Sequence, residues 1–292
     1  MVLKQLEQNI KQDMRLYHDH VKNDPFTILN EKYDAFSHYN TKINEQFMEF
    51  SLEELGFPTA DFLLDKTLNI VNEIGGIKGW SKNNNISNKY RGFSLCYNPD
   101  GDEHLRSPYA SLGHPELNWS YSKSNNPNPP WKEVKNTYYD TYGFNTVHPV
   151  VKKHYAKFFE CIDLMPTRSR VMWESPGHKQ RWHLDEVLWQ CVRINIPLVT
   201  EPSYVLQIDG TDEYGNTLKL EKHLEVGKAY VWNTRIRHRV LDIGDAKNER
   251  VHIVAAFMTW FKKENNHWKT NKYFGVQPFD MVKSKLIFAY AI

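Results

Sequence analysis

Hydrophobic residues follow two different periods along the chain, and the change falls near Pro166. Before it, apolar positions recur at helical spacing in residues 1–17, 59–75 and 147–165. These three segments therefore predict amphipathic helices. Between about residues 80 and 130 the periodicity is lost, and we expect a loop-rich stretch there.

Local signals support these boundaries. Thr59 or Asp61 can cap the start of the helix predicted over 59–75, and Gly75 can end it. The segments Asn83–Asn88 and Ser124–Trp131 are rich in asparagine and proline, which is typical of solvated loops. An alternative for such loops is a lid over an active site.

After Pro166 the pattern becomes short apolar runs broken by turn residues, which is typical of strands. The predicted strands are Arg168–Glu174, Leu188–Leu198, Tyr204–Ile208, Thr217–Leu220, Lys228–Asn233, Arg239–Ile243 and Arg250–Phe261. Many short strands in succession, with no intervening helices, indicate a barrel or a sandwich. The chain shows neither βαβ alternation nor a glycine-rich phosphate loop.

The change in period suggests how the 292 residues are organised. We expect residues 166–265 to form a mainly β catalytic core. Residues 1–165 are expected to form a helical and loop-rich N-terminal region that packs on this core. Residues 266–292 form a C-terminal extension.

Composition narrows the choice of function. Lysines and arginines number 37 against 35 acidic residues, and without a basic stripe nucleic-acid binding is not expected. Since no apolar run approaches the roughly 18 residues of a membrane span, we expect no membrane segment. The three cysteines are odd in number and far apart, which argues against a disulfide framework. We expect a soluble protein of a reducing cytoplasm, whose oligomeric state the sequence does not reveal.

Candidate chemistry begins at His183 and Asp185, which are separated by one residue. Residues two apart on an extended chain point to the same face, so this imidazole and this carboxylate can converge on one point. A spacing this simple also arises by chance, and the alternative is a solvated strand end.

The case for a metal site is strengthened by two other residues, His238 and Arg250, which lie much further along the chain. His238 follows a predicted strand, and two histidines with one carboxylate form the facial triad of non-heme Fe(II) oxygenases. Arg250 opens the last long strand, and its guanidinium fork can pair bidentately with the carboxylate of a cosubstrate. The alternatives are a surface histidine and a structural ion pair of Arg250 with Asp242 or Asp245.

In this order of residues the chain resembles the Fe(II)/2-oxoglutarate-dependent oxygenases. Within them it is most similar to the aspartyl/asparaginyl β-hydroxylase and proline hydroxylase group. The resemblance covers about a third of the chain and is carried by "SRVMWESPGHKQRWHLDE", "RINIPLVTEP", "LEVGKAYVWNTRIRHRVLDIGD" and "ERVHIVAAF". It implies a mainly β double-stranded β-helix, a cupin-like jelly roll, for the core. It also implies that the regions outside the core, here chiefly the helical N-terminal region predicted above, shape the substrate pocket. It also implies Fe(II), 2-oxoglutarate and O₂ as cofactor and cosubstrates.

The resemblance also assigns roles to residues. His183, Asp185 and His238 would be the catalytic iron ligands, and Arg250 would bind 2-oxoglutarate. Because Asp185 fills the position that a halide takes in related halogenases, hydroxylation is expected rather than halogenation.

Other pocket residues are expected with less support from the pattern. Arg193 and Asn195 alternate with apolar neighbours and should share the inward face of their strand, where they can contact 2-oxoglutarate or the substrate. Asn195 replaces the histidine that is usual in the family. Trp182, Trp232 and Arg235 are candidates for substrate binding. For both tryptophans the alternative is a place in the core.

By analogy with the family, the substrate is expected to be a small-molecule amino acid, an amino-acid derivative or a peptidyl side chain. Two other classes of function remain open. One is a cupin-type metalloenzyme that uses the same fold without 2-oxoglutarate, in which Arg250 would be expendable. The other is a non-catalytic binding protein on the same scaffold.

Overall fold

The structure is a computed structural model. It describes residues 46–79, 89–99, 103–112, 144–185, 191–212, 215–264, 267–274 and 276–292. The helix predicted over residues 1–17 and the loops predicted at 83–88 and 124–131 lie outside these ranges.

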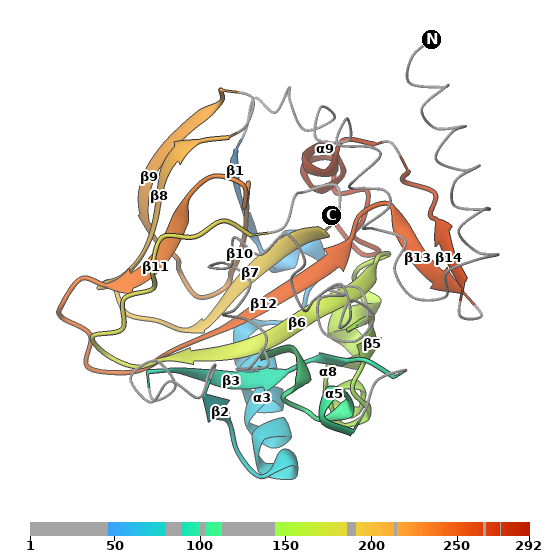
Figure 1. Cartoon of the computed structure of the whole chain (residues 1–292), viewed down its shortest axis with the longest axis horizontal. Helices are drawn as coiled ribbons and strands as arrows, with labels where there is room; N and C mark the ends of the chain where they lie inside the picture. The colour runs from blue at the N-terminus through green and yellow to red at the C-terminus, as the bar shows by residue number, and fades with distance from the viewer. Residues whose placement is uncertain are drawn as a thin grey trace, which may run out of the picture.

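Strands dominate the described residues (Figure 1). The strands are β1 (Phe47–Ser51), β2 (Lys78–Gly79), β3 (Tyr90–Ser94), β4 (Cys96–Tyr97), β5 (Thr146–Val147), β6 (Met165–Glu174), β7 (Cys191–Val199), β8 (Tyr204–Thr211), β9 (Thr217–His223), β10 (Lys228–Trp232), β11 (His238–Asp242), β12 (Arg250–Met258), β13 (Phe261–Glu264) and β14 (His267–Thr270). The helices are α3 (Ala60–Ile74), α5 (Glu103–Arg106), α8 (Pro149–Glu160) and α9 (Pro278–Lys283), with 3-10 turns η2 (Glu53–Leu55) and η3 (Ala110–Leu112).

Two antiparallel sheets face each other. The larger has seven strands in the order β1-β10-β7-β12-β6-β3-β2, and the smaller has the order β11-β8-β9. Residues 179–183 extend the smaller sheet, because Lys179 pairs with Leu241 and His183 pairs with His238 in antiparallel bridges. In Figure 1 the strands β8, β9 and β11 stand apart from the larger sheet at one side of the molecule.

This connectivity is that of a double-stranded β-helix, as the resemblance implied. From β6 onward the chain crosses repeatedly between the sheets: β6, β7, β10 and β12 lie in the larger sheet, and residues 179–183, β8, β9 and β11 lie in the smaller one. Strands that are distant in sequence therefore become neighbours, as β6 and β12 do along most of their length. The side chains that face inward from both sheets surround a common interior.

The period-two pattern decides which side chains face that interior. On β7, Val192, Ile194 and Ile196 lie in the main hydrophobic core with the helices, whereas Arg193 and Asn195 line a cavity on the other face. The prediction that these two polar residues share the inward face is confirmed. A smaller apolar cluster between the sheets contains Leu206, Ile208, Leu224, Tyr230, Trp232, Ile236 and Val240.

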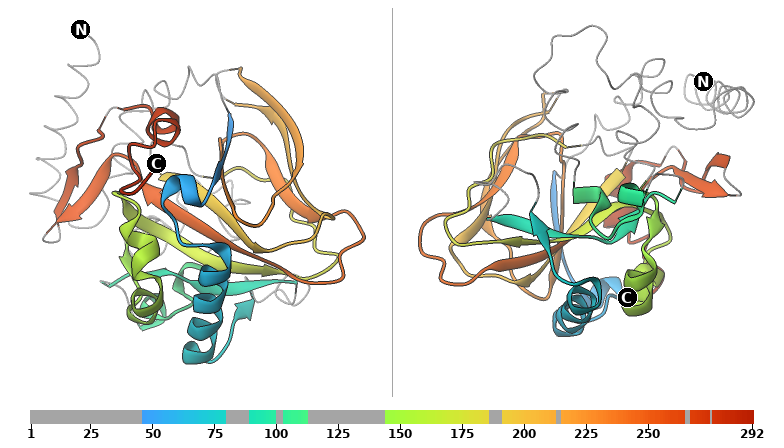
Figure 2. Two further views of the ribbon diagram at one scale, coloured as in Figure 1. Left: turned by 180° about the vertical axis from the view of Figure 1, so that it is seen from behind. Right: turned by 60° about the horizontal axis from the view of Figure 1, so that its bottom comes forward.

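Helices α3 and α8 cover the outer face of the larger sheet (Figure 2). As predicted, α3 begins after Thr59, whose hydroxyl accepts the Phe62 N–H, and ends at Gly75 with φ of 79°. The predicted helix 147–165 is shorter in the structure, because His148 precedes a proline at the first position and the helix ends at Glu160. None of the described helices is both long and apolar enough to cross a membrane.

The larger sheet also recruits strands that the sequence pattern did not reveal. β1 pairs with β10, and β3 pairs with β6, although both precede Pro166. β3 falls in the stretch of about residues 80–130 that was expected to be rich in loops. It is fitted closely to β6, since a Cβ on Gly92 would lie 2.1 Å from the Val171 carbonyl oxygen. The predicted strand 250–261 is interrupted, because β12 ends at Met258 and β13 starts at Phe261.

Candidate metal centre

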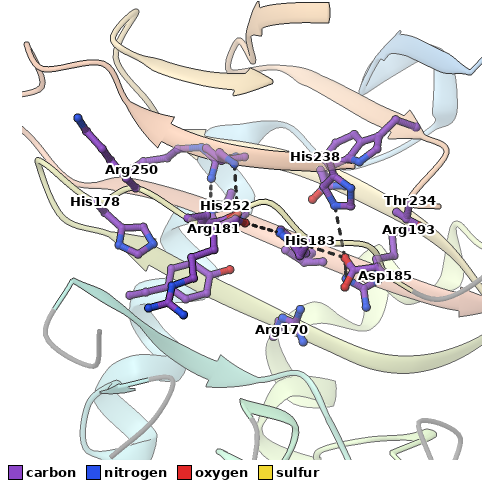
Figure 3. Close-up of a pocket in the computed structure, with 17 residues that line it drawn as sticks. Arg170, His178, Arg181, His183, Asp185, Arg193, Thr234, His238, Arg250 and His252 are labelled. Atoms are coloured by element: carbon purple, nitrogen blue, oxygen red, sulfur yellow. Dashed lines mark hydrogen bonds and ion pairs between the residues drawn. The ribbon is translucent and has the colours of Figure 1, made fainter. Parts of the chain in front are cut away.

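A cavity of about 400 Å³ opens between the two sheets. Its floor consists of inward-facing residues of β6, β7 and β12, and its wall consists of Tyr90 of β3, residues 178–185, the end of β10 with Thr234, and β11. The residues that line it are Tyr90, Arg170, His178, Lys179, Gln180, Arg181, His183, Asp185, Arg193, Asn195, Trp232, Thr234, His238, Val240, Arg250, His252 and Val254. Figure 3 shows these side chains converging from both sheets.

His183 and His238 are brought together by the backbone. Each donates its N–H to the carbonyl of the other at 3.1 Å, so the two residues form one antiparallel bridge. Directly opposed residues of an antiparallel pair project to the same face. Their ring centroids accordingly lie 4.4 Å apart.

Backbone carbonyls hold both imidazoles in one tautomer. Nδ1 of His183 lies 2.9 Å from the carbonyl of Arg181, and Nδ1 of His238 lies 2.9 Å from the carbonyl of Ile236. A carbonyl accepts, so each Nδ1 must carry the proton. In the neutral ring each Nε2 then presents its lone pair, as a metal ligand requires. Burial, which is the main cause, holds the pKa of His183 below its ordinary value and favours the neutral ring.

Asp185 completes the group. Its backbone N–H donates to the carbonyl of Thr234 at 2.9 Å, which extends the pairing that begins at His183. Its Oδ2 lies 3.8 Å from Nε2 of His183 and 3.6 Å from Nε2 of His238. Burial opposes ionisation of this carboxyl, but the charge of the neighbouring Arg193 outweighs it and holds the pKa of Asp185 well below the usual range. The aspartate is therefore a carboxylate at neutral pH.

The donor set fits a divalent transition metal. One ligand atom from each of the three residues lies within 4.8 Å of the others, and no other such group of three occurs in the part of the chain that the structure describes. Two imidazole lone pairs and a carboxylate directed at one point need a cation between them. Two histidines and a carboxylate on one face are typical of non-heme Fe(II) sites, which leave positions open for exogenous ligands.

Arg193 lies closer to this centre than the sequence suggested. Its Nη1 donates to Oδ2 of Asp185, so it contacts a candidate metal ligand directly. Asn195, two residues further along β7, also lines the cavity. Whether either residue contacts 2-oxoglutarate remains a prediction.

Arg250 lies at the other end of the cavity and is 1% exposed. Its Nη1 is 3.2 Å from Oε1 of Glu174 and donates to Nδ1 of His252 at 2.9 Å. His252 is therefore neutral, and burial followed by the charge of Arg250 holds its pKa well below the ordinary value. An ion pair of Arg250 was one alternative from the sequence, but its partner is Glu174. The other carboxylate considered, Asp242, instead accepts backbone N–H groups of Gly177, Gly244 and Ala246.

Of the three residues expected to contact the substrate, only Trp232 lines the cavity. Trp232 lines the cavity, and its ring meets that of His238 edge-on with centroids 5.6 Å apart. Trp182 lies outside the cavity lining, because alternation along an extended chain directs it away from His183. It packs instead beneath the guanidinium groups of Arg237 and Arg239, at 5.3 and 4.5 Å from the ring centroid. Arg235 is also absent from the lining.

Sequence reasoning missed several cavity residues. Arg170 and Glu174 lie on β6 and share its inward face; Arg170 lines the cavity, and Glu174 supports Arg250. Their spacing of four on a predicted strand was a usable signal, since a polar residue on an otherwise buried strand face needs a partner. Tyr90 and His178, which stack with centroids 5.2 Å apart, carried no comparable signal. The pairing of β3 with β6 places Tyr90 opposite Glu174, close to the segment after β6 that carries His178.

Comparisons with known proteins give fold-level likenesses. No family model matches the chain, and no curated protein does. Among solved structures, a prolyl-4-hydroxylase of Pseudomonas putida is 12% identical, with 76% of this chain and 97% of that chain covered and a TM-score of 0.38. A Trichoplax adhaerens prolyl hydroxylase in complex with a hypoxia inducible factor peptide fragment is 13% identical, with 79% and 92% covered and a TM-score of 0.38.

A third similar structure is a 2OG-Fe(II) oxygenase family oxidoreductase of Burkholderia pseudomallei. It is 11% identical, with 76% of this chain and 89% of that chain covered and a TM-score of 0.39. Likenesses this limited assign neither residues nor an activity to this chain.

Proposed function

We propose that the chain is an Fe(II)/2-oxoglutarate-dependent oxygenase that hydroxylates an unactivated C–H bond of an amino acid, an amino-acid derivative or a peptidyl side chain. The observation that carries the proposal is the convergence of His183, Asp185 and His238, with both Nε2 lone pairs and the carboxylate directed at one point. This convergence lies in a cavity that also contains the buried Arg250.

In this proposal His183, Asp185 and His238 hold Fe(II), and Arg250 binds the far carboxylate of 2-oxoglutarate. Bound iron with 2-oxoglutarate and O₂ would supply the oxidising power for C–H hydroxylation. The protein supplies position and an enclosed site. Glu174 and His252 fix the guanidinium of Arg250, and a fixed fork loses less freedom when it binds a carboxylate.

The N-terminal region shapes the pocket in this proposal. Tyr90 of β3 lines the cavity and packs against a small cluster of Leu112, Met172 and Val254. Tyr90 is the one cavity-lining residue before Pro166 in the part of the chain that the structure describes, which supports this role, while the proposed catalytic groups come from the β core.

One observation favours a second candidate. Because Glu174 already neutralises Arg250, this arginine can be a structural ion pair. The protein would then be a cupin-type metalloenzyme that binds a metal but not 2-oxoglutarate. Arg250 binds 2-oxoglutarate in the first candidate and binds no ligand in the second. Measuring 2-oxoglutarate binding therefore separates the two candidates.

The test is calorimetry of 2-oxoglutarate with the Ni(II)-loaded protein, in which nickel replaces iron without turnover. The oxygenase proposal predicts saturable binding that disappears in His183→Ala and is strongly weakened in Arg250→Met, while both variants keep their folded circular dichroism spectra. Metal binding without any 2-oxoglutarate binding favours the cupin-type enzyme. Absence of metal binding contradicts both candidates.

A further inference from the structure

Glu174 is a buried carboxyl group behind Arg250, at the end of the cavity where the far carboxylate of 2-oxoglutarate is proposed to bind. It is 0% exposed and lies directly opposite Arg250 in the pairing of β6 with β12. Its Oε1 lies 3.2 Å from Nη1 of Arg250 and accepts from Nε2 of Gln180 at 2.8 Å. Its Oε2 is buried and has no hydrogen-bond partner among the described residues. The carboxyl group is therefore only partly satisfied by hydrogen bonds.

Arg250 is the one cation whose charge acts on Glu174 in the part of the chain that the structure describes. His252 on β12 is neutral, and burial, followed by nearby cations, lowers the pKa of His178 to about 4, so neither adds a charge at neutral pH. The other charged or titratable groups on the elements around Glu174 are Tyr90 and Arg91 of β3, Lys89 before β3, Arg170 of β6, Lys179 and Arg181 after β6, Tyr204 of β8, Asp242 of β11 and Glu249 before β12. Compensation of the charge on Glu174 therefore depends on Arg250.

A dicarboxylic cosubstrate at Arg250 brings a second carboxylate to the same guanidinium. Two carboxylates that share one buried site disfavour each other's ionised form. Burial, the largest effect on Glu174, already outweighs Arg250 and Gln180 and holds the pKa of Glu174 above its ordinary value. The arriving charge acts in the same direction. Protonation of Glu174 removes the repulsion, and the neutral carboxyl group gains an O–H that can donate to the ligand.

The contacts of Glu174 allow this protonation without moving Arg250. A proton on Oε2 leaves Oε1 as an acceptor for Gln180 and Arg250. Nδ1 of His252 still accepts from Arg250 on the other side. Figure 3 shows Arg250 and His252 together at the end of the cavity away from Asp185. The guanidinium therefore keeps its position while its charge is transferred from Glu174 to the ligand.

From these contacts we propose that Glu174 holds Arg250 in place of the far carboxylate of 2-oxoglutarate and takes up one proton from solvent when that carboxylate binds. The charges balance, because the ligand brings one negative charge to Arg250 and the proton removes one from Glu174. Glu174 is thus a positioning residue that acts through Arg250 and sets the pH dependence of cosubstrate binding. The inference rests on the proposed function, since it takes Arg250 as the group that binds 2-oxoglutarate.

Proton uptake makes the affinity for 2-oxoglutarate fall as the pH rises. Between the pKa of Glu174 in the free protein and its higher pKa in the complex, the complex holds a proton that the free protein does not. Within this window the affinity falls by up to about 10-fold per pH unit, because one proton is bound with each ligand. Ordinary carboxyl groups have pKa values of about 4, so 2-oxoglutarate itself does not titrate above pH 6.

Calorimetry of 2-oxoglutarate with the Ni(II)-loaded protein measures this proton directly and involves no turnover. Titrations at pH 6, 7 and 8, each in buffers of different ionisation enthalpy, give the number of protons taken up per ligand bound. We expect uptake of a substantial fraction of one proton at one or more of these pH values, with affinity falling toward higher pH. The inference is overturned if 2-oxoglutarate binds without proton uptake at all three.

Three variants identify the group that takes up the proton. Glu174→Gln imitates the protonated carboxyl group, so its binding should take up no proton. It should also bind 2-oxoglutarate more tightly, by up to about 10-fold for each unit by which the pH exceeds the pKa of Glu174 in the free protein. His178→Phe should keep the proton uptake, and so should Arg239→Leu, which removes a charge outside the cavity lining. Weaker binding by Glu174→Gln with unchanged uptake, or loss of uptake in His178→Phe, overturns the inference.

The same titrations separate this inference from the proposed function. If the unchanged protein binds Ni(II) but no 2-oxoglutarate, both fail. If it binds 2-oxoglutarate without proton uptake, the inference fails while the proposed function stands. Should Glu174→Gln not fold, the proton count of the unchanged protein at the three pH values still decides, and His178→Phe checks the source of the uptake.

Discussion

His183 and His238 exchange two backbone hydrogen bonds across a single antiparallel bridge, and each imidazole is fixed by a second carbonyl of its own segment. The geometry of the candidate metal centre is therefore set by backbone rather than by side-chain packing. Such a centre needs little rearrangement when a metal binds, because the backbone already holds both Nε2 atoms side by side on one face.

This arrangement predicts that loss of one ligand removes metal binding and leaves the fold intact. His183→Ala should weaken Co(II) or Fe(II) binding by more than the roughly 10–100-fold that is typical when only an orienting group is lost. The measurement is metal titration by calorimetry, with circular dichroism as the check on folding. His154→Ala is the matched control, because His154 contacts Glu73 on α3, away from the cavity lining. Equal affinity in both variants would refute the assignment.

The buried pair of Glu174 and Arg250 predicts strongly coupled mutations. Either Glu174→Leu or Arg250→Met leaves one buried charge uncompensated, which typically costs about 3–5 kcal/mol of unfolding free energy. The double variant removes both charges and should cost less than the sum of the two. Urea denaturation of the four proteins measures the coupling. Strictly additive losses would show that the two charges do not stabilise each other.

The surroundings of His178 predict that the folded protein loses part of its stability in acid. Burial, then Lys89 and Arg250, lower its pKa from 6.5 to about 4. Between these values the unfolded chain binds a proton that the folded protein does not, so the stabilisation present above pH 6.5 is lost as the pH falls toward 4. In His178→Phe, which can keep the stacking on Tyr90, the melting temperature should fall less steeply from pH 7 to pH 5. Parallel curves for the two proteins would exclude this role.

The different surroundings of the two tryptophans predict different phenotypes. Trp182→Leu removes two cation–π contacts near the surface, each worth roughly 0.5–1 kcal/mol, and should leave 2-oxoglutarate binding unchanged within about 2-fold. Trp232→Leu removes a wall of the cavity and should weaken ligand binding. Parallel calorimetric titrations of the two variants test the contrast, which fails if Trp182→Leu weakens 2-oxoglutarate binding as much as Trp232→Leu does.

Local patterns predicted much of the core. The strand period alone placed Arg193 and Asn195 on the inward face of β7, and capping by Thr59 and Gly75 gave the bounds of α3. Both features depend on residues close in sequence, where steric and hydrogen-bonding preferences act directly.

Features that depend on distant pairing could not be predicted in this way. β1 becomes a strand by pairing with β10, and β3 by pairing with β6, although neither segment has strong strand periodicity. The partner of Arg250 was missed for the same reason, since Glu174 meets it only through the register of β6 with β12. Trp182 was a candidate for the pocket because it adjoins His183, with a place in the core as the alternative, yet adjacent residues on an extended chain point to opposite faces.

The most direct test of the proposed function is anaerobic absorption spectroscopy of the protein with Fe(II) and then 2-oxoglutarate. The account predicts the weak visible charge-transfer band of an iron-chelated 2-oxo acid, at full intensity in Arg239→Leu and absent in His183→Ala. In Arg250→Met the band should require far higher 2-oxoglutarate concentrations. Iron binding without any band in the unchanged protein would contradict the account.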